Sequence, residues 1–234
     1  NDPNLQNIPI KTLEGRKIRK AFVASNNNFI FSVDYSQVEL RILAHVAKVD
    51  SLLNAFEKNE DIHSVTAMEV FQVDKTSLNS DLRRKAKTIN FGIIYGISPY
   101  GLAAQLDISN SEAKQYIESY FKKYPGIKEY MDKTVKDCRS KGYVATPFGR
   151  RIFIPFINDK VANRRNFAER SAINAPIQGG AADLIKLAMP KIYKFLTKEK
   201  LMSKMLIQVH DELIFEVPQN EINIMKHNIP TIMS

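Results

Sequence analysis

Two apolar runs on either side of an acidic turn, near the C-terminal end, constrain the fold of this chain most strongly. Met205–Val209 leads up to the turn and Leu213–Val217 leads away from it, and both runs are rich in β-branched or aromatic residues. This pattern predicts an antiparallel β-hairpin. Its tip carries Asp211 and Glu212. Carboxylates beside apolar strands are costly in their charged form unless a cation compensates them.

A second acid occupies an equivalent position near the N-terminal end. Asp34 comes at the end of the strand-like stretch Phe29–Tyr35. Two strands that each deliver an aspartate to one end of a sheet are a plausible site for a divalent metal ion, because such ions prefer oxygen ligands. We therefore expect a metal site that includes Asp34 and Asp211.

Composition indicates a globular protein with a polyanionic partner. Of the 234 residues, 44% are apolar and 25% are charged, and the formal net charge is +9. Such a charge favours nucleic acid as a partner, although a merely soluble basic surface is an equal alternative. The single cysteine, Cys138, excludes an internal disulfide framework and suits a reducing compartment. No signal peptide or membrane-spanning run is recognisable. The start at Asn1 and the stop at Ser234, inside an apolar-patterned segment, suggest a piece of a longer protein.

Helical periodicity dominates the middle of the chain. The N-terminal stretch 1–24 reads as irregular to short-stranded, and Ser36 is a fair N-cap for a helix that continues to about His45. A small hairpin is expected over Gly142–Pro155. Further helices are expected over Ile62–Phe71, Asp81–Tyr95, Ser98–Leu106, Ser111–Lys123, Gly126–Lys141, Asn163–Asn174 and Gly180–Lys200. The helical middle therefore interrupts a region that bears the sheet.

One of these helices carries a stripe of chemically distinctive side chains. Arg83, Lys87, Phe91 and Tyr95 follow one another at intervals of four residues, so they share one slowly drifting face about 18 Å long. Two cations followed by two aromatic rings can hold a triphosphate at one end and a base and sugar at the other. A solvated basic face with two core aromatics is the alternative, and the stripe alone leaves both open.

Several motifs resemble those of family A DNA polymerases, the bacterial DNA polymerase I class. The stretch from Asp34 to Arg41 resembles motif A of that family, Arg83–Gly96 resembles motif B, and Val209–Glu212 resembles motif C. The flanking stretches 2–9, 61–63 and 174–179 match as well. The resemblance runs in order over nearly the whole chain.

The resemblance implies an α+β fold with an antiparallel-sheet palm and a mostly helical fingers insertion. The expected divisions are palm over residues 1–45, fingers over 46–160 and palm again over 161–234. The upstream thumb is expected to be absent, and the palm to be truncated at its C-terminal end, giving a truncated right-hand polymerase. Pro190 is expected to bend its helix locally, because proline removes a backbone donor.

The resemblance also implies a catalytic metal site. Asp34 and Asp211 match the two aspartates that hold a pair of Mg²⁺ ions, for which Mn²⁺ is a possible substitute, and the Tyr35 carbonyl is expected to add a backbone ligand. Such ions stabilise the attacking and leaving oxygens of an in-line displacement. Glu212 matches a supporting acid, with a solvated hairpin carboxylate as the alternative.

A site for the incoming deoxynucleoside triphosphate is implied next. Arg83 and Lys87 match the cations that bind the triphosphate, and Lys87 is also the candidate to protonate the pyrophosphate. Phe91, where the family carries Phe or Tyr, is expected to disfavour dideoxynucleotides. The resemblance also implies that Gln37 and His63 contact the phosphates. It further implies that Glu39 and Tyr95 together form a steric gate against ribonucleotides. For His63 an ordinary helix-surface histidine is an alternative.

Contacts to primer–template DNA complete the implied site. Arg170, Asn174 and Gln178 match residues that contact the minor groove, and His210 is expected near the primer terminus. The implied protein is a monomeric enzyme of replication or repair, without a membrane, in the bacterial cytoplasm at the nucleoid or in an organelle. The implied reaction joins a deoxynucleotide to a primer 3′-hydroxyl and releases pyrophosphate. A non-catalytic nucleic-acid-binding domain and a metal-dependent nuclease are the two competing interpretations.

Overall fold

The structure is a computed structural model that describes residue 9 and residues 12–234. Their fold combines helices with two antiparallel sheets, which confirms the expected α+β class. The chain divides into two compact units. One joins the N-terminal part up to Ser36 with Ala182–Ser234, and the other is Gln37–Ala181. The palm and fingers divisions at 45/46 and 160/161 stay predictions; the compact units change at 36/37 and 181/182.

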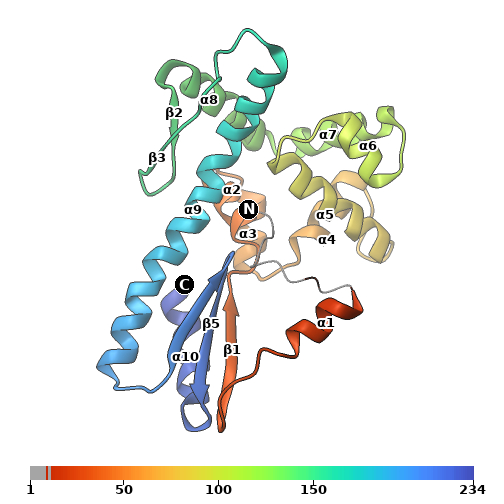
Figure 1. Ribbon diagram of the computed structural model, residues 1–234. Helices are drawn as coiled ribbons and strands as arrows, with labels where there is room; N and C mark the ends of the chain where they lie inside the picture. Colours follow the sequence, from red (N-terminus) through yellow and green to blue (C-terminus); the bar gives the residue numbers. More distant parts are fainter. Residues whose placement is uncertain (1–8, 10–11) are drawn as a thin grey trace. The chain divides into compact units, whose positions relative to one another are not determined.

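A three-stranded antiparallel sheet forms the centre of the first unit (Figure 1). Its strands are β1 (Asn28–Asp34), β4 (Lys204–Val209) and β5 (Glu212–Pro218), in the order β1-β5-β4. The last two are the predicted hairpin, so that prediction is confirmed. Strand β1 joins the hairpin by pairing with β5 along its whole length. Segments from the two ends of the chain thus form one sheet.

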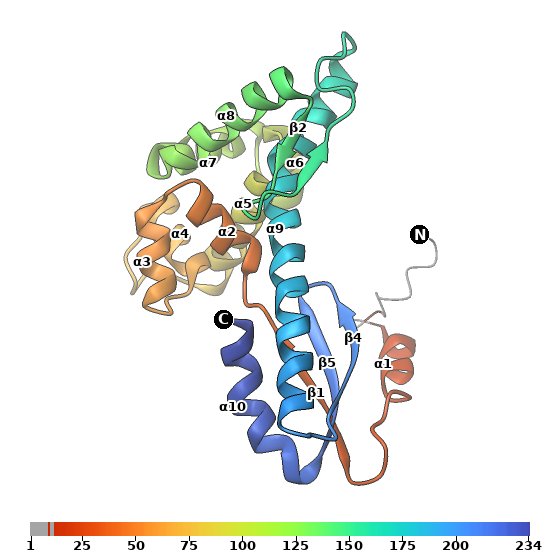
Figure 2. The same ribbon diagram turned by 90° about the vertical axis from the view of Figure 1, so that its left-hand side faces the viewer.

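Two helices cover one face of this sheet (Figure 2). They are the C-terminal part of α9 (Ala162–Lys198) and α10 (Ile222–Met233), which follows the 3₁₀ turn η1 (Gln219–Glu221). Alternate residues of β5 (Leu213, Phe215 and Val217) are fully buried against Ile192 and Ile229 of these helices. The intervening residues of β5 therefore lie on the opposite face, because successive side chains of a strand alternate.

A short helix, α1 (Leu13–Arg19), lies in the stretch that the sequence led us to expect as irregular. That expectation is wrong for these residues. Thr12 caps the helix, because its side-chain oxygen accepts a hydrogen bond from the Gly15 amide at 3.1 Å. Of the matching stretch 2–9, residues 2–8 lie outside the described residues.

The second unit is mostly helical. Its helices are α2 (Val38–Val46), α3 (Asp50–Glu57), α4 (Ile62–Phe71), α5 (Ser80–Ile94), α6 (Pro99–Leu106), α7 (Asn110–Lys123) and α8 (Pro125–Lys141), followed by the N-terminal part of α9. A hairpin of β2 (Tyr143–Ala145) and β3 (Arg151–Phe153) separates α8 from α9. The predicted positions of α4 to α8 agree with the structure to within one residue. Among the described residues, no helix is both long and apolar enough to span a bilayer.

The start of α2 differs from the prediction. Gln37, and not Ser36, is the N-cap, and it has a left-handed backbone with φ 55° and no side-chain capping bond. The sequence signal for Ser36 was local and did not indicate the left-handed backbone at Gln37. Helix α3 was not predicted; its N-cap, Val49, offers no capping side chain.

The third difference is α9, which was expected as two helices and is a single element of 37 residues. It continues through Pro176 and Pro190. Close packing in its middle favours this continuity: a Cβ atom on Gly179 would lie 2.7 Å from Thr146, and one on Gly180 would lie 3.2 Å from Pro147. The glycines thus allow the β2–β3 hairpin to pack against the helix backbone.

Candidate functional site

The predicted acids lie at one end of the sheet. Asp34 is the last residue of β1 and is paired with Glu212, the first residue of β5. The ladder continues for one more step, because the Tyr35 amide donates a hydrogen bond to the Asp211 carbonyl at 3.1 Å. The register therefore brings Asp34, Asp211 and Glu212 to the same end of two neighbouring strands.

The side chains at this end of the sheet have different surroundings. Asp34 and Glu212 share the sheet face opposite the apolar core, and Glu212 accepts a hydrogen bond from the Ser32 hydroxyl on that face. The Tyr35 side chain is tied to the end of α10, because its hydroxyl donates to the Met233 carbonyl at 2.7 Å. Burial raises the pKa of this phenol. Ser32 therefore holds Glu212, whereas the Tyr35 ring serves packing.

His210 precedes the acids in the β4–β5 turn. It is exposed and has a left-handed backbone with φ 54°. The Gln208 side-chain amide donates to its carbonyl at 3.2 Å, across the turn. The turn thereby presents His210 and Asp211 at the tip of the hairpin.

The donor set suits Mg²⁺. Among the described residues, no group of three or more His, Cys, Asp or Glu side chains is arranged to hold a metal ion. Two aspartates at adjacent strand ends form a smaller set of hard oxygen donors. Mg²⁺ is commonly bound by one or two carboxylates together with water and substrate phosphates, so two aspartates are sufficient.

Helix α5 carries the predicted stripe. A cavity of about 630 Å³ lies along it, and its lining includes Lys87, Phe91, Tyr95 and also Arg170 of α9. Arg84 lines the cavity as well, whereas Arg83 is not among its lining residues. The structure therefore brings three of the four stripe residues to one cavity wall. The alternative that Phe91 and Tyr95 are core residues is wrong for Tyr95, which is 40% exposed.

The two aromatic residues of the stripe stack on each other, and Tyr95 also contacts Glu39. The rings of Phe91 and Tyr95 are nearly parallel, at 16°, with centroids 6.5 Å apart. The Tyr95 hydroxyl donates a hydrogen bond of 2.6 Å to Oε2 of Glu39 in the first turn of α2. This bond holds the glutamate at the C-terminal end of α5. Gln37 lies at the start of α2 and is half-buried.

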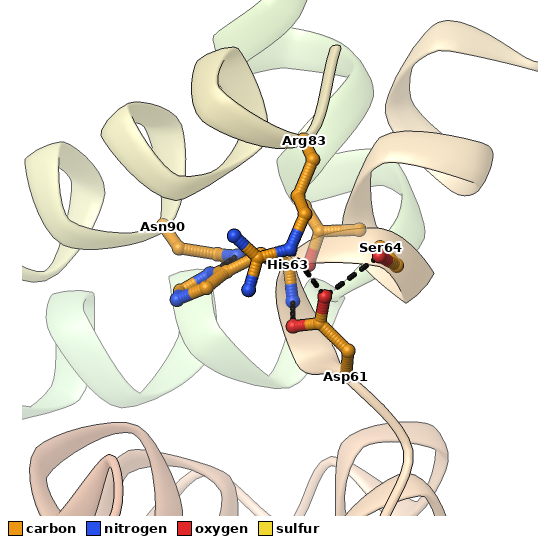
Figure 3. A network of polar contacts seen from close by, with 6 residues as sticks. Asp61, His63, Ser64, Arg83 and Asn90 are labelled. Carbon is orange, nitrogen blue, oxygen red and sulfur yellow. Dashed lines mark hydrogen bonds and ion pairs between the residues drawn. The ribbon is translucent and has the colours of Figure 1, made fainter. Parts of the chain in front are cut away.

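Arg83 is engaged elsewhere, at the start of α4 (Figure 3). Its Nε lies 2.5 Å from Oδ2 of Asp61. Asp61 also caps α4, since its other oxygen accepts from the His63 amide at 3.2 Å, and it accepts from the Ser64 hydroxyl at 2.7 Å. Partial burial alone would raise the pKa of Asp61, but the hydrogen bonds from Arg83 and Ser64 hold it below its usual value. The same bond raises the pKa of Arg83.

His63 is a buried residue, only 2% exposed, so the alternative of an ordinary surface histidine is wrong. Its ring lies 5.7 Å from that of Phe91, and its Nδ1 is 3.2 Å from Nδ2 of Asn90. Burial lowers the pKa of the imidazole, and the positive charges of Arg83 and Lys87 lower it further, against the attraction of Asp61. Burial and the two cations thus favour the neutral form of His63.

The predicted DNA contacts lie on α9 at intervals of four residues. Arg170 and Gln178 are exposed and Asn174 is half-buried, with an Oδ1 atom that has no hydrogen-bond partner in the described part of the chain. Arg170 packs against Gly96, where φ is 66° and a Cβ atom would approach the arginine side chain to 2.8 Å. Glycine is thus required there by both conformation and space.

Our sequence analysis assigned no role to Asp61, Asn90 or Thr66. Asp61 could have been recognised as a helix N-cap, because it directly precedes the apolar-patterned α4. Asn90 is fully buried in an otherwise apolar part of α5, and Thr66 is fully buried on α4. A buried polar residue needs a partner, but the sequence does not say which.

Comparison with known proteins agrees with this arrangement. The family model described as DNA polymerase family A matches residues 1–234. The DNA polymerase I of Bacillus caldotenax is 51% identical over 233 residues, which cover 99% of this chain and 27% of that protein. The DNA polymerase I of Lactococcus lactis subsp. cremoris is 53% identical over 226 residues, or 96% of this chain and 26% of that protein. The chain thus spans about a quarter of the length of these relatives.

A solved structure matches equally well. The POL domain of Pol1 from M. smegmatis, in complex with DNA primer-template and dNTP, superimposes with a TM-score of 0.93 at 43% identity. The match covers 99% of this chain and 41% of that one. By sequence over its full length and by fold, the chain belongs to DNA polymerase family A.

Proposed function

We propose that this chain is the part of a DNA polymerase that joins deoxynucleotides to a primer under the direction of a template. In this reaction the primer 3′-hydroxyl attacks the α-phosphate of a deoxynucleoside triphosphate, and pyrophosphate leaves. The observation that carries the proposal is the convergence of Asp34 and Asp211, far apart in the sequence, at adjacent strand ends. The related Pol1 domain, solved with DNA primer-template and dNTP, supports DNA and nucleotide as substrates.

Asp34 and Asp211 bind the metal ions in this proposal, with the Tyr35 carbonyl as a further ligand. Two Mg²⁺ ions, when bound, activate the attacking hydroxyl and neutralise the departing pyrophosphate. The two aspartates determine where the metal ions would lie. Glu212, which accepts a hydrogen bond from Ser32, adds a further negative charge beside them. Mn²⁺ can replace Mg²⁺ in such an oxygen-rich site.

The face of α5 binds the incoming nucleotide. Lys87 is exposed on the cavity wall, so it can bind the triphosphate and donate a proton to pyrophosphate. Arg83, Gln37 and His63 add phosphate contacts. Arg83 contacts Asp61 through Nε. Its two terminal nitrogens can therefore donate to phosphate oxygens.

Glu39 and Tyr95 select the sugar, and Phe91 stacks beside it. The hydrogen bond from Tyr95 keeps the carboxylate in one position, so that a 2′-hydroxyl would meet it. The gate therefore excludes ribonucleotides by shape.

The duplex is contacted by Arg170, Asn174 and Gln178, with His210 near the primer terminus. Minor-groove acceptors occupy similar places in all base pairs, so arginine and amide side chains can check pair shape without reading sequence. The net charge of +9 supports a polyanionic partner. We further propose that the whole protein acts as a monomer in bacterial DNA replication or repair.

Primer extension tests this function against its two competitors. The full-length parent protein is incubated with a labelled primer–template, the four deoxynucleoside triphosphates and Mg²⁺. A polymerase lengthens the primer by the templated bases. Shortening of the primer would indicate a nuclease, and binding with no change in length would indicate a non-catalytic module; either result would contradict the proposal.

A further inference from the structure

A cluster of polar side chains, most of them buried, leads from Glu69 on α4 to the imidazole of His63. Its members are Glu69, Tyr124, Thr66, Asn90 and His63, all in the second unit. Tyr124, Thr66 and Asn90 are fully buried. Because water does not reach these three groups, each donor must find its acceptor within the chain.

An ion pair holds the carboxylate end of the cluster. Lys123 Nζ lies 3.1 Å from Glu69 Oε1. The Tyr124 hydroxyl donates a hydrogen bond to the other carboxylate oxygen of Glu69. Burial, and then this bond to Glu69, raise the pKa of Tyr124, so the phenol keeps its proton.

Thr66 holds the amide of Asn90. The Thr66 hydroxyl donates its single hydrogen to Asn90 Oδ1 at 3.2 Å, so its oxygen accepts from Asn90 Nδ2, which lies 3.0 Å away. The second hydrogen of the same amide nitrogen points to His63 Nδ1 at 3.2 Å. An imidazole nitrogen that accepts a hydrogen bond carries no proton.

We infer that Asn90 is a positioning residue that keeps His63 neutral with its proton on Nε2. This inference rests on the proposed function, in which His63 contacts the triphosphate. A neutral imidazole with Nε2–H donates one hydrogen bond to a phosphate oxygen without adding a third positive charge beside Arg83 and Lys87. The opposite tautomer would direct a lone pair at the phosphate and repel it.

The tautomer itself is measured by NMR on the full-length protein labelled with ¹⁵N-histidine, with His63→Gln to assign the signal. Long-range ¹⁵N–¹H correlations separate the two neutral tautomers and the imidazolium. At pH 7 we expect Nε2–H, and a shift of this signal when deoxynucleoside triphosphate is added. The inference would be overturned if the proton lay on Nδ1 or if the ring were an imidazolium. A His63 signal that does not shift when nucleotide is added would also overturn it. The tautomer can be read even if primer extension fails, so the two failures are distinguishable.

Asn90→Asp reverses the direction of the hydrogen bond between residue 90 and His63 Nδ1. A carboxylate accepts from Nδ1–H, raises the pKa of His63 and leaves Nε2 unprotonated once the ring loses its charge. We expect KM for the nucleotide to rise about tenfold from pH 7 to pH 9 in this variant and less than about twofold in the parent. Asn110→Asp, an exposed site on α7, adds the same charge as a control and should behave like the parent. A variant with the pH profile of the parent would contradict the inference.

Thr66→Val serves if Asn90→Asp does not fold. It replaces the hydroxyl by a methyl group of similar size and removes both hydrogen bonds between Thr66 and the Asn90 amide. The Asn90 amide then loses the partner that orients it. We expect a mixture of His63 tautomers in the NMR spectrum, whereas a purely structural role of Thr66 would leave the tautomer unchanged.

Discussion

Single hydrogen bonds in this protein hold the groups that would select the nucleotide. The bond from Tyr95 to Glu39 joins residues from α5 and α2. A carboxylate held by a charge-assisted bond has fewer positions open to it than a free side chain. In the proposed function, the precision of the sugar gate therefore depends on the hydroxyl of Tyr95 as well as on Glu39.

The gate is tested by removing that hydroxyl. In the full-length parent, Tyr95→Phe leaves the ring in place and frees Glu39, so ribonucleotide incorporation relative to deoxynucleotide should rise about tenfold. Glu39→Ala should raise it at least as much. The ratio of kcat/KM for the two sugars measures the effect. An unchanged ratio in both variants would remove the gate assignment.

Phe91 supplies a second test at this scale. Its ring stacks on that of Tyr95 and carries no polar group. Phe91→Tyr adds one hydroxyl beside the expected sugar position, which can replace the missing 3′-hydroxyl of a dideoxynucleotide. We expect dideoxy termination to increase on the order of tenfold, measured in a primer-extension ladder. An unchanged frequency of dideoxy termination would show that Phe91 lies away from the sugar.

At the level of elements, helix caps explain why several boundaries could be predicted. Asn79, Ser98 and Ser109 each accept a hydrogen bond from the backbone at the start of their helices. These signals are local and can be read from the sequence. The start of α2 at Gln37 and the passage of α9 through Pro176 depend on long-range packing, so local patterns led to the wrong expectation.

The cap of α7 allows a measurement of stability. Ser109 and Glu112 form a reciprocal capping box, in which Ser109 Oγ accepts from the Glu112 amide at 3.2 Å and Glu112 accepts from the Ser109 amide at 3.1 Å. Ser109→Ala should cost about 1 kcal/mol in the local free energy of unfolding. Hydrogen exchange of the first-turn amides of α7 reports this. Ser111→Ala, exposed within the same helix, is the control, and equal exchange rates in the two variants would contradict the capping role.

Residue types in the candidate site could be predicted, and the resemblance paired Glu39 with Tyr95, but the partner of Arg83 could not be predicted. Asp34, Asp211, Lys87 and Tyr95 were recognisable from strand ends and helical spacing. The ion pair of Arg83 with Asp61 joins two helices through side chains. No periodicity encodes such a pair, because it depends on how α4 packs against α5.

Over the whole molecule, each compact unit organises one part of the proposed chemistry. The first contains the acids at the end of the sheet, and the second contains the cavity along α5 and the network around His63. The first unit is built from segments at both ends of the chain. The helical unit is thus an insertion between two strands of one sheet, as the order of motifs in the sequence predicted.

The central claim is that Asp34 and Asp211 together hold the catalytic metal ions, and Asp211→Asn in the full-length parent tests it most directly. We predict that single-turnover nucleotide incorporation falls by about a thousandfold or more, because several kcal/mol of charge stabilisation is lost, while the Kd for primer–template changes little. Glu216→Gln, on strand β5 and away from the turn, should retain activity. Incorporation by Asp211→Asn within about tenfold of the parent would contradict the account.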